Sequence, residues 1–401
     1  MTFAWEKPSF AATAYATADS KPLPVDGSLI FHFDPFGEPP PYQGGYAGLS
    51  VPTLSVPDSM TLSAQLSCAV SRPDATVAES AATIATKVTT TARPIRGETS
   101  TVKVGRHDVP FSNPDKLFFP ERELTKGDLV SYYLAVADCV LPHLRRRLFH
   151  MKRYPNGVDG EFFHQKRVPP HPEYVGEQFV TFPSGHSTVF AVIDNAAALA
   201  WVINLGCIEL HTWHSRIDDI ERPDYLLIDL DPTVDGQWPF VRDIALVVRD
   251  VMGELGVASY PKTSGATGLH ILAPIKTELL FPDVRRFAKA LAEEVERRIG
   301  DQEVATTTWR VADRRGVFVD FGQNARDRTI ASAYSVRPTL DARVSAPLSW
   351  DEVAGVEPDA FTIETMRDRI EKVGDPMRGM WRSRPSLVSR FAKLGLEAPQ
   401  P

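Results

Sequence analysis

The stretch Asp224-Tyr225-Leu226-Leu227-Ile228-Asp229-Leu230-Asp231-Pro232 decides the fold. It reads as an apolar β-strand over 225–230 that ends in two carboxylates separated by one residue. Side chains alternate faces along a strand, so Asp229 and Asp231 point the same way. Two neighbouring carboxylates repel each other unless a cation lies between them, and hard divalent cations prefer oxygen ligands. The alternative is a solvated strand end that Pro232 closes with a turn.

A third carboxylate has the same surroundings later in the chain. In Gly316-Val317-Phe318-Val319-Asp320 an apolar strand again ends in an aspartate. Three carboxylates on strand ends suit a metal-dependent phosphoryl-transfer enzyme, because two metal ions stabilise both the attacking and the leaving oxygen. We therefore expect Asp229, Asp231 and Asp320 to be metal ligands and catalytic residues.

A glycine-rich turn precedes another candidate strand, in Thr263-Ser264-Gly265-Ala266-Thr267-Gly268-Leu269-His270. Glycines let backbone N–H groups approach an anion closely, and the hydroxyl groups add donors. His270 could donate to a phosphate oxygen. The alternative is a hairpin turn beside a buried histidine.

The segment after the third carboxylate is polar. Val319-Asp320-Phe321-Gly322-Gln323-Asn324 is followed by Arg326, Arg328 and Arg337. Amides suit a sugar or a base edge, and arginines suit a triphosphate, so the segment could complete a nucleotide site. A polar loop with surface arginines is the alternative.

Composition sets only loose limits. The chain has 401 residues and a net charge of −7. This net charge does not indicate a nucleic-acid-binding protein, although a local basic patch matters more than the net charge of the whole chain. Such a patch is present at Arg145, Arg146, Arg147, Lys152 and Arg153. The three cysteines form neither a disulfide framework nor a zinc spacing. We expect a cytoplasmic protein, because the sequence shows no membrane-spanning run and no secretory signal.

The composition changes near residue 95. Residues 1–98 are rich in Ala, Ser, Thr and Pro, and we expect a low-complexity, poorly ordered extension there. A small β-rich appendage using 29–33 is the alternative. Residues 99–401 read as one globular domain, and its segment 345–401 could cap either the core or bound DNA.

Within the globular part, helical and strand patterns are mixed. Thr125-Lys126-Gly127-Asp128 resembles a capping box that opens a helix through Val140. We expect strands at 187–193, 225–230, 269–273 and 316–321, and helices at 240–254 and 283–299. No regular βαβ repetition is present, so the fold class is α+β.

Together these stretches resemble the archaeo-eukaryotic primase superfamily, and more specifically the polymerase domain of the multifunctional bacterial DNA ligases that repair double-strand breaks. The resemblance runs from about Asn113 to Arg337, through Asp-Leu-Asp-Pro, Ser-Gly-x-x-Gly-Leu-His and Val-Asp-Phe-x-Gln-Asn in that order. It implies an RRM-like primase-polymerase core of mixed and antiparallel sheets flanked by helices. It also implies template-dependent addition of NTP or dNTP at gapped or broken DNA carrying a 5′-phosphate, with Mn²⁺ or Mg²⁺ and a frequent preference for ribonucleotides.

The resemblance assigns further residues to three sites. For the nucleotide it implies Ser264, Thr267, His270, His211, Gln323, Arg328 and Arg337. For the DNA 5′-phosphate it implies Asn113, Lys116 and Lys126, and for the template Lys152, Phe162 and Phe163. The position of Thr267 is usually a lysine in this family, so the resemblance implies either a weaker nucleotide affinity or compensation by Arg326 or Arg328.

No Lys-x-Asp-Gly adenylation motif occurs in the sequence. We therefore expect a stand-alone, nucleoid-associated polymerase that works with Ku and a separate ATP-dependent DNA ligase. Two other functions stay open: a metal-dependent phosphodiesterase or nuclease, and a catalytically weak DNA-end-binding module, which Thr267 would favour.

Overall fold

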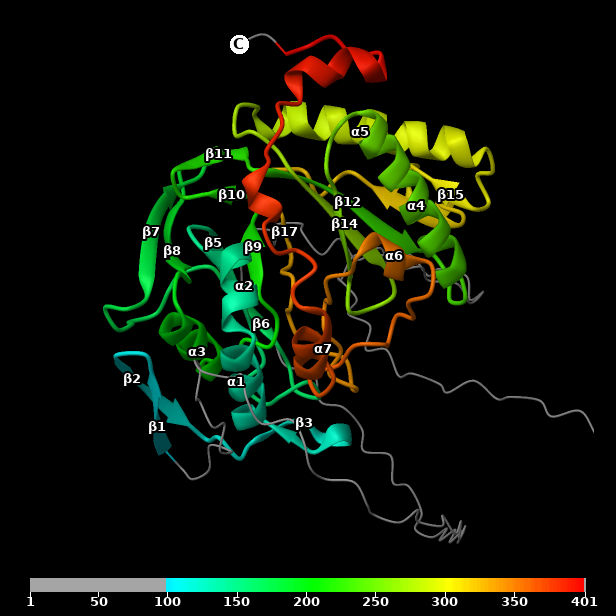
Figure 1. Cartoon of the computed structure of the whole chain (residues 1–401). Helices are drawn as coiled ribbons and strands as arrows, with labels where there is room; N and C mark the ends of the chain where they lie inside the picture. Colours follow the sequence, from blue (N-terminus) through cyan, green and yellow to red (C-terminus); the bar gives the residue numbers. More distant parts are fainter. Residues whose placement is uncertain (1–98, 400–401) are drawn as a thin grey trace, which may run out of the picture. The chain divides into compact units, whose positions relative to one another are not determined.

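The computed structural model describes residues 99–399, coloured from cyan to red in Figure 1. The expected low-complexity extension at 1–98 lies outside the described residues, as does Cys68. In the described part, no helix is both long enough and apolar enough to cross a membrane.

Helices and strands alternate irregularly along the chain. The α-helices are α1 (Lys126–Ala135), α2 (Ala137–Leu144), α3 (Ala196–Asn204), α4 (Trp238–Glu254), α5 (Phe281–Ile299), α6 (Trp350–Val353) and α7 (Met366–Val373). Short 3₁₀ turns are η1 (Pro120–Arg122), η2 (Val311–Asp313), η3 (Met380–Arg382) and η4 (Val388–Leu394). The strands are β1 (Thr99–Val104), β2 (His107–Ser112), β3 (Leu117–Phe119), β4 (Leu124–Thr125), β5 (Leu148–Arg153), β6 (Phe163–Gln165), β7 (Gly176–Thr181), β8 (Ser187–Val192), β9 (His211–Trp213), β10 (Ser215–Arg216), β11 (Asp219–Pro223), β12 (Tyr225–Pro232), β13 (Tyr260–Thr263), β14 (Leu269–Pro274), β15 (Ala305–Thr306), β16 (Val317–Asp320) and β17 (Thr329–Ala331).

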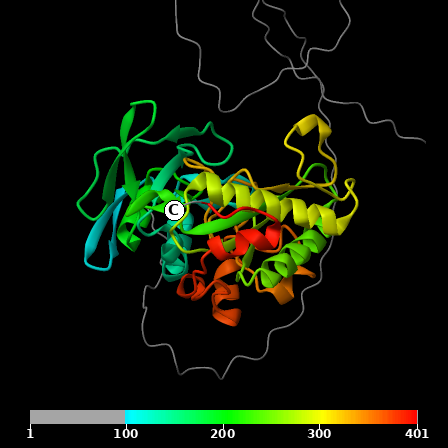
Figure 2. The same ribbon diagram turned by 90° about the horizontal axis from the view of Figure 1, so that it is seen from above.

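Strand β12 is the centre of a five-stranded sheet with the order β13-β14-β12-β16-β15. It pairs antiparallel with both β14 and β16, and only the short β15–β16 pair is parallel. Helices α4 and α5 lie next to each other and cover one face of this sheet, as Figure 2 shows.

The side chains of β12 alternate between two cores. Leu226, Ile228 and Leu230 pack in the cluster with α4 and α5, whereas Tyr225 and Leu227 pack in a second cluster with α1, α2 and α3. Because the alternation continues to the strand end, Asp229 and Asp231 lie on the face of Tyr225 and Leu227.

The second sheet has the order β17-β9-β5-β8-β7, with β6 paired to β5 outside this path. All of its strand pairs are antiparallel. The expected α+β class with mixed and antiparallel sheets flanked by helices is confirmed. The expected strands at 187–193, 225–230, 269–273 and 316–321 and the two long helices also form, with ends shifted by one or two residues.

The capping box at Thr125 is confirmed, but the helix that follows it is shorter than expected. Thr125 Oγ1 accepts a hydrogen bond from the Asp128 backbone N–H at 3.2 Å, and Asp128 Oδ2 accepts one from the Thr125 N–H at 2.8 Å. The expectation of one helix through Val140 is wrong. Val136 adopts φ −99° and ψ 10°, which ends α1, and α2 begins at Ala137.

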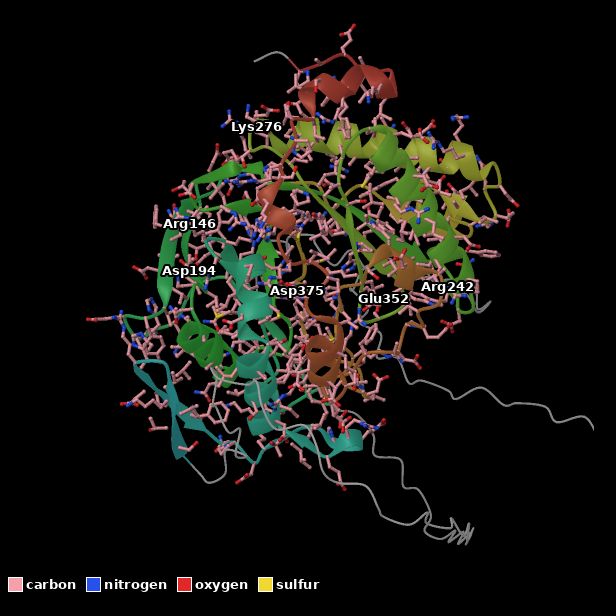
Figure 3. The ribbon with its side chains drawn as sticks, viewed as in Figure 1. Arg146, Asp194, Arg242, Lys276, Glu352 and Asp375 are labelled. Carbon is pink, nitrogen blue, oxygen red and sulfur yellow. The ribbon has the colours of Figure 1, made fainter. Side chains whose placement is uncertain are left out.

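The C-terminal segment packs against the core. Leu387 and Phe391 are buried in the cluster of α4 and α5, where Phe391 lies 5.2 Å from Phe287 between ring centroids. Figure 3 labels two acidic side chains that fix this segment: Glu352 accepts from Arg369 at 2.6 Å, and Asp375 accepts from the Tyr334 hydroxyl at 2.5 Å.

Candidate active site

Three carboxylates meet at the end of the central sheet. Asp229 on β12 lies directly opposite Asp320 on β16 in the strand register, and Asp231 follows two residues along the same face. One oxygen from each residue can be chosen so that all three lie within 4.8 Å of one another. Among residues 99–399, these are the one set of three His, Cys, Asp or Glu side chains so arranged. The three oxygens could hold a divalent cation.

The electrostatics of this triad favour a cation. Burial, followed by the charges of Asp231 and Asp320, raises the pKa of Asp229 well above its usual range. Burial and the charge of Asp320 raise the pKa of Asp231 to about 6. Burial also raises the pKa of Asp320, although the Gly322 N–H donates to it at 2.5 Å. Asp229 Oδ1 is buried and accepts no hydrogen bond, so negative charge is left uncompensated here.

The glycine-rich turn lies against the triad. A Cβ atom on Gly268 would lie 2.2 Å from the Leu230 carbonyl oxygen, so only glycine lets the turn approach the end of β12 this closely. Ser264 Oγ accepts hydrogen bonds from the backbone N–H groups of Ala266 and Gly268, both at 3.0 Å. The Ser264 hydroxyl thus holds the turn together, and Thr267 is exposed at its tip.

His270 links the triad to a buried lysine that the sequence analysis missed. His270 Nε2 lies 3.3 Å from Asp229 Oδ1, and Lys262 Nζ contacts His270 Nδ1 on the other side of the ring. Lys262 is fully buried and donates to the Ala331 carbonyl at 2.9 Å and to Ser345 Oγ at 2.6 Å. Burial lowers the pKa of Lys262 well below its usual range. Lys262 and His270 therefore fix each other's position behind the carboxylates.

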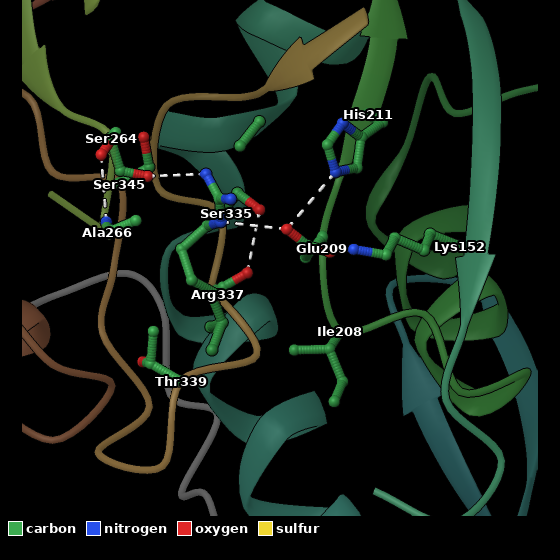
Figure 4. A network of polar contacts seen from close by, with 12 residues as sticks. Lys152, Ile208, Glu209, His211, Ser264, Ala266, Ser335, Arg337, Thr339 and Ser345 are labelled. Carbon is green, nitrogen blue, oxygen red and sulfur yellow. Dashed lines mark hydrogen bonds and ion pairs between the residues drawn. The ribbon is translucent and has the colours of Figure 1, made fainter. Parts of the chain in front are cut away.

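Glu209 is a second residue that the sequence analysis missed. Its carboxylate contacts three residues of the expected sites, as Figure 4 shows. Its buried carboxylate lies 2.7 Å from Lys152 Nζ, 2.9 Å from Arg337 Nε and 3.5 Å from His211 Nε2. It also accepts from the Tyr154 hydroxyl at 2.7 Å. We call these residues the Glu209 cluster. Burial alone would raise the pKa of Glu209, but the neighbouring His211, Arg337 and Lys152 outweigh burial and hold it below its usual range.

The Glu209 cluster connects two of the sites implied by the resemblance. His211 and Arg337 were expected to contact the nucleotide, and Lys152 was expected to contact the template. The signal in the sequence was an acidic residue inside the apolar run Cys207-Ile208-Glu209-Leu210, two positions before His211 and so on its face. Arg337 also donates to the Ser264 carbonyl at 2.8 Å, which ties the cluster to the glycine-rich turn.

The expected template side is exposed and aromatic. The Lys152 ammonium lies 4.4 Å from the centre of the Phe162 ring, and the Phe162 and Phe163 side chains are about half exposed. Exposed rings beside basic groups can stack on nucleobases.

The three residues expected at the 5′-phosphate lie together next to the start of α1. The Lys116 N–H donates to the Asn113 carbonyl at 3.2 Å, and the Lys126 N–H donates to the Lys116 carbonyl at 2.8 Å. Lys116 is half-buried and Asn113 is exposed, whereas the Lys126 ammonium is buried on the Ser112 carbonyl at 2.8 Å and Asn204 Oδ1 at 2.7 Å. Burial, with the charges of Lys116 and Arg153, lowers the pKa of Lys126 to about 8.

The remaining expected nucleotide residues lie on the segment after Asp320. Gln323 Nε2 donates to Asp320 Oδ2 at 3.2 Å, so Gln323 orients a carboxylate of the triad. Arg328 is half-buried, and Arg326 is paired with Glu221 at 2.9 Å. Besides Arg337, the cation beside the glycine-rich turn is Arg343, which the sequence analysis missed and whose Nη1 donates to the Ala266 carbonyl at 3.4 Å.

Comparisons with known proteins identify the family of the chain. A family model described as "LigD, primase-polymerase domain" matches residues 125–377. The multifunctional non-homologous end joining protein LigD of Mycolicibacterium smegmatis is 31% identical over 271 residues, which cover 67% of this chain and 35% of the relative. The bifunctional non-homologous end joining protein LigD of Bacillus subtilis is 31% identical over 295 residues, which cover 71% and 47%. The chain thus spans less than half the length of these relatives.

One solved structure has the same fold. The polymerase domain from Mycobacterium tuberculosis Ligase D, determined in complex with DNA, aligns with a TM-score of 0.64 and 29% identity. The alignment covers 69% of this chain and 98% of that domain.

Proposed function

Because the chain belongs to the LigD primase-polymerase family, we propose that it is a template-dependent nucleotidyltransferase that extends DNA 3′ ends at gaps or double-strand breaks. The observation that carries the proposal is the triad of Asp229, Asp231 and Asp320, which lies against the glycine-rich turn that Arg337 ties to the Glu209 cluster. Such a set of carboxylates is suited to phosphoryl transfer.

The residues of the triad fit a pair of divalent cations, Mn²⁺ or Mg²⁺. Their oxygens are close together, one is orphaned, and burial raises the pKa of each carboxyl group. Bound cations would neutralise the phosphate charge and lower the pKa of the attacking hydroxyl. Gln323 holds Asp320 in orientation, and His270 Nε2 lies 3.3 Å from Asp229 Oδ1.

The reaction would join a 3′-hydroxyl oxygen to the α-phosphorus of a bound nucleotide. The bond from that phosphorus to the bridging oxygen breaks, pyrophosphate leaves, and the hydroxyl proton passes to solvent. The turn at Ser264, with Arg337 and His270 around it, would bind and orient the polyphosphate. Lys152, Phe162 and Phe163 would hold the template base opposite. Ribonucleotides with Mn²⁺ are the expected preferred substrates.

Asn113, Lys116 and Lys126 would recognise the 5′-phosphate on the far side of a gap. The accessible Lys116 ammonium, which now donates to Asn156 Oδ1 at 2.7 Å, would make the direct contact. Lys126 would stabilise the pocket without contacting the phosphate, since its ammonium is bound to protein oxygens. Lys116→Ala should reduce the preference for 5′-phosphorylated over 5′-hydroxyl gaps without loss of stability. Equal preference in wild type and variant would place the pocket elsewhere.

The test is primer extension on a gapped duplex, with each metal and with both sugar types. A primer lengthened by the templated nucleotide, fastest with Mn²⁺ and NTP, supports the proposal. A shortened primer would indicate a phosphodiesterase or nuclease. Tight binding without any change in length would indicate an end-binding module. In a repair setting, this activity would take place on nucleoid DNA, with Ku and a separate ATP-dependent DNA ligase as partners.

A further inference from the structure

A groove of about 810 Å³ adjoins the segment after Asp320, and none of its lining residues belongs to the triad, the glycine-rich turn or the Glu209 cluster. The first turns of α5 form one wall, and the loop carrying Trp309 and the segment 321–326 form the rest. Its floor is apolar, with Phe281 and Phe321 buried in it. Two large apolar side chains of the lining remain exposed, Leu280 at 44% and Trp309 at 57%. An exposed tryptophan over an apolar floor is the composition of a ligand groove rather than of an ordinary surface.

The rim of the groove is basic. Four cationic side chains line it, Arg285, Arg286, Lys289 and Arg326, against the single acidic Glu221. Arg326 is paired with Glu221, Arg286 lies 3.4 Å from Asp283, and Lys289 is paired with Glu293. Arg285 has no ion-pair partner among the described residues, and its guanidinium lies 5.6 Å from the centre of the Trp309 ring. A cation and an aromatic face side by side fit a phosphate and a nucleobase.

The groove and the triad pack against the same glycine, Gly322. A Cβ atom on Gly322 would lie 2.7 Å from the Trp309 ring and 2.9 Å from Asp320 Oδ1, so the ring, the glycine and the carboxylate are in close succession. The Gly322 N–H donates to that same carboxylate. Only Gly322 therefore separates a ligand stacked on Trp309 from Asp320, a proposed metal ligand.

We propose that this groove binds the unpaired 3′-terminal segment of a DNA strand, with a base stacked on Trp309 and a phosphate on Arg285. The identity of the strand rests on the proposed function, since the strand that is extended must bring its 3′-hydroxyl to the triad. The expected template residue Lys152 lies on β5 of the other sheet, where its ammonium contacts Glu209 and the Phe162 ring. The groove adjoins Asp320 rather than the expected template residues. We therefore assign it to the strand that is extended.

The test is binding of a short single-stranded oligonucleotide to the full chain, measured by fluorescence anisotropy without metal or nucleotide. Trp309→Ala should weaken binding roughly tenfold, because base stacking on an aromatic ring contributes that much per base. Trp309→Phe should restore most of it. The matched control is Val311→Ala, which changes a residue of the same loop that is 76% exposed and does not line the groove.

The phosphate contact has its own pair of variants. Arg285→Ala should weaken binding and flatten its salt dependence by roughly one phosphate contact. Arg297→Ala is the control, because Arg297 lies on the same helix but is paired with Glu294 and does not line the groove. Equal binding by wild type, Trp309→Ala and Arg285→Ala would overturn the proposal, and the groove would then suit an apolar peptide instead.

Photo-cross-linking assigns the strand end. A 5-iododeoxyuridine at the 3′ terminus should cross-link to Trp309, and the same base at the 5′ terminus should not. Equal cross-linking from both ends would overturn the assignment to the 3′ segment. These readouts do not depend on catalysis. A chain that cross-links at Trp309 but adds no nucleotide would support the groove while the proposed function fails. If the wild type adds nucleotides but Trp309→Ala binds the oligonucleotide as tightly as the wild type, the groove proposal is overturned and the proposed function stands.

Discussion

The two ends of strand β12 carry carboxylates in opposite electrostatic surroundings. At its start, Asp224 accepts from Arg147 at 2.6 and 2.9 Å and from Arg216 at 2.6 Å. Burial alone would raise the pKa of Asp224, but the two guanidinium groups lower it. At its other end, Asp229 and Asp231 face Asp320, and their pKa values are raised.

The difference separates a carboxylate that is paired within the fold from carboxylates that we propose to bind metal. A buried charge that is fully paired holds neighbouring elements together, and its removal damages the fold. Buried like charges without a counter-ion strain the fold, and a protein keeps such an arrangement where a ligand supplies the missing charge. The comparison predicts that mutations at the two ends of β12 separate stability from activity.

The largest expected effect is on activity at the functional end. Asp229→Ala or Asp320→Ala should reduce nucleotide addition to background, because each removes an oxygen from the proposed cation site. The metal-free variants should be at least as stable as wild type, since like-charge repulsion is relieved. Primer extension and urea unfolding in EDTA measure the two effects. Asp235→Ala, in the exposed loop after β12, is the control and should behave as wild type.

The largest expected effect on stability lies at the paired end. Arg147→Ala leaves Asp224 with one partner in a site where both side chains are 1% exposed. The free energy of unfolding should fall by about 3–5 kcal/mol. The folded fraction should still add nucleotides, because Arg147 is remote from the proposed chemistry. Unchanged stability in urea would show that the pair does not hold this end of the strand.

A smaller effect concerns the uncharged tip of the glycine-rich turn. Thr267 is exposed, and the nearby Arg343 is partly neutralised by Asp341 at 2.6 Å. Thr267→Lys should lower KM for the nucleotide, since a charge-assisted contact contributes about 1.5–3 kcal/mol, roughly ten- to hundredfold. A KM that is unchanged or raised would mean that Arg343 or Arg337 already supplies this charge.

The smallest effect is on the pH dependence of stability, where the two ends should differ in sign. The lowered pKa of Asp224 contributes stability that is lost as pH falls through that pKa. The raised pKa of Asp231, about 6, means that metal-free protein loses stability as pH rises from the ordinary carboxyl range to about 6. Unfolding of Asp231→Asn and wild type in EDTA should differ more at pH 7 than at pH 4. Parallel profiles would contradict the raised pKa.

The sequence predicted what depends on local patterns. Alternation along β12 placed Asp229 and Asp231 on one face, and the antiparallel partner strand brought Asp320 opposite. Glu209 and Lys262 were missed because their partners come from distant parts of the chain: Arg337 lies 128 positions after Glu209, and Ser345 lies 83 positions after Lys262. No periodicity reports such contacts.

The same limit explains an error in the basic stretch. Arg145, Arg146 and Arg147 were grouped in one basic patch, which is wrong for Arg147, because that side chain is buried on Asp224. Arg146 is paired with Asp218 at the surface. The sequence shows that the positive charges are clustered. It does not show that Arg147 is buried, because its partner Asp224 lies 77 positions later.

The most direct test of the central claim is the number of Mn²⁺ ions bound per chain. Electron paramagnetic resonance of free Mn²⁺ measures it, in the presence of gapped DNA and a non-hydrolysable ribonucleotide. Wild type should take up about two ions, Asp224→Asn should retain them in its folded fraction, and the double variant Asp229→Asn, Asp320→Asn should lose them. Equal Mn²⁺ uptake by the double variant and wild type would contradict the assignment of the triad as the metal site.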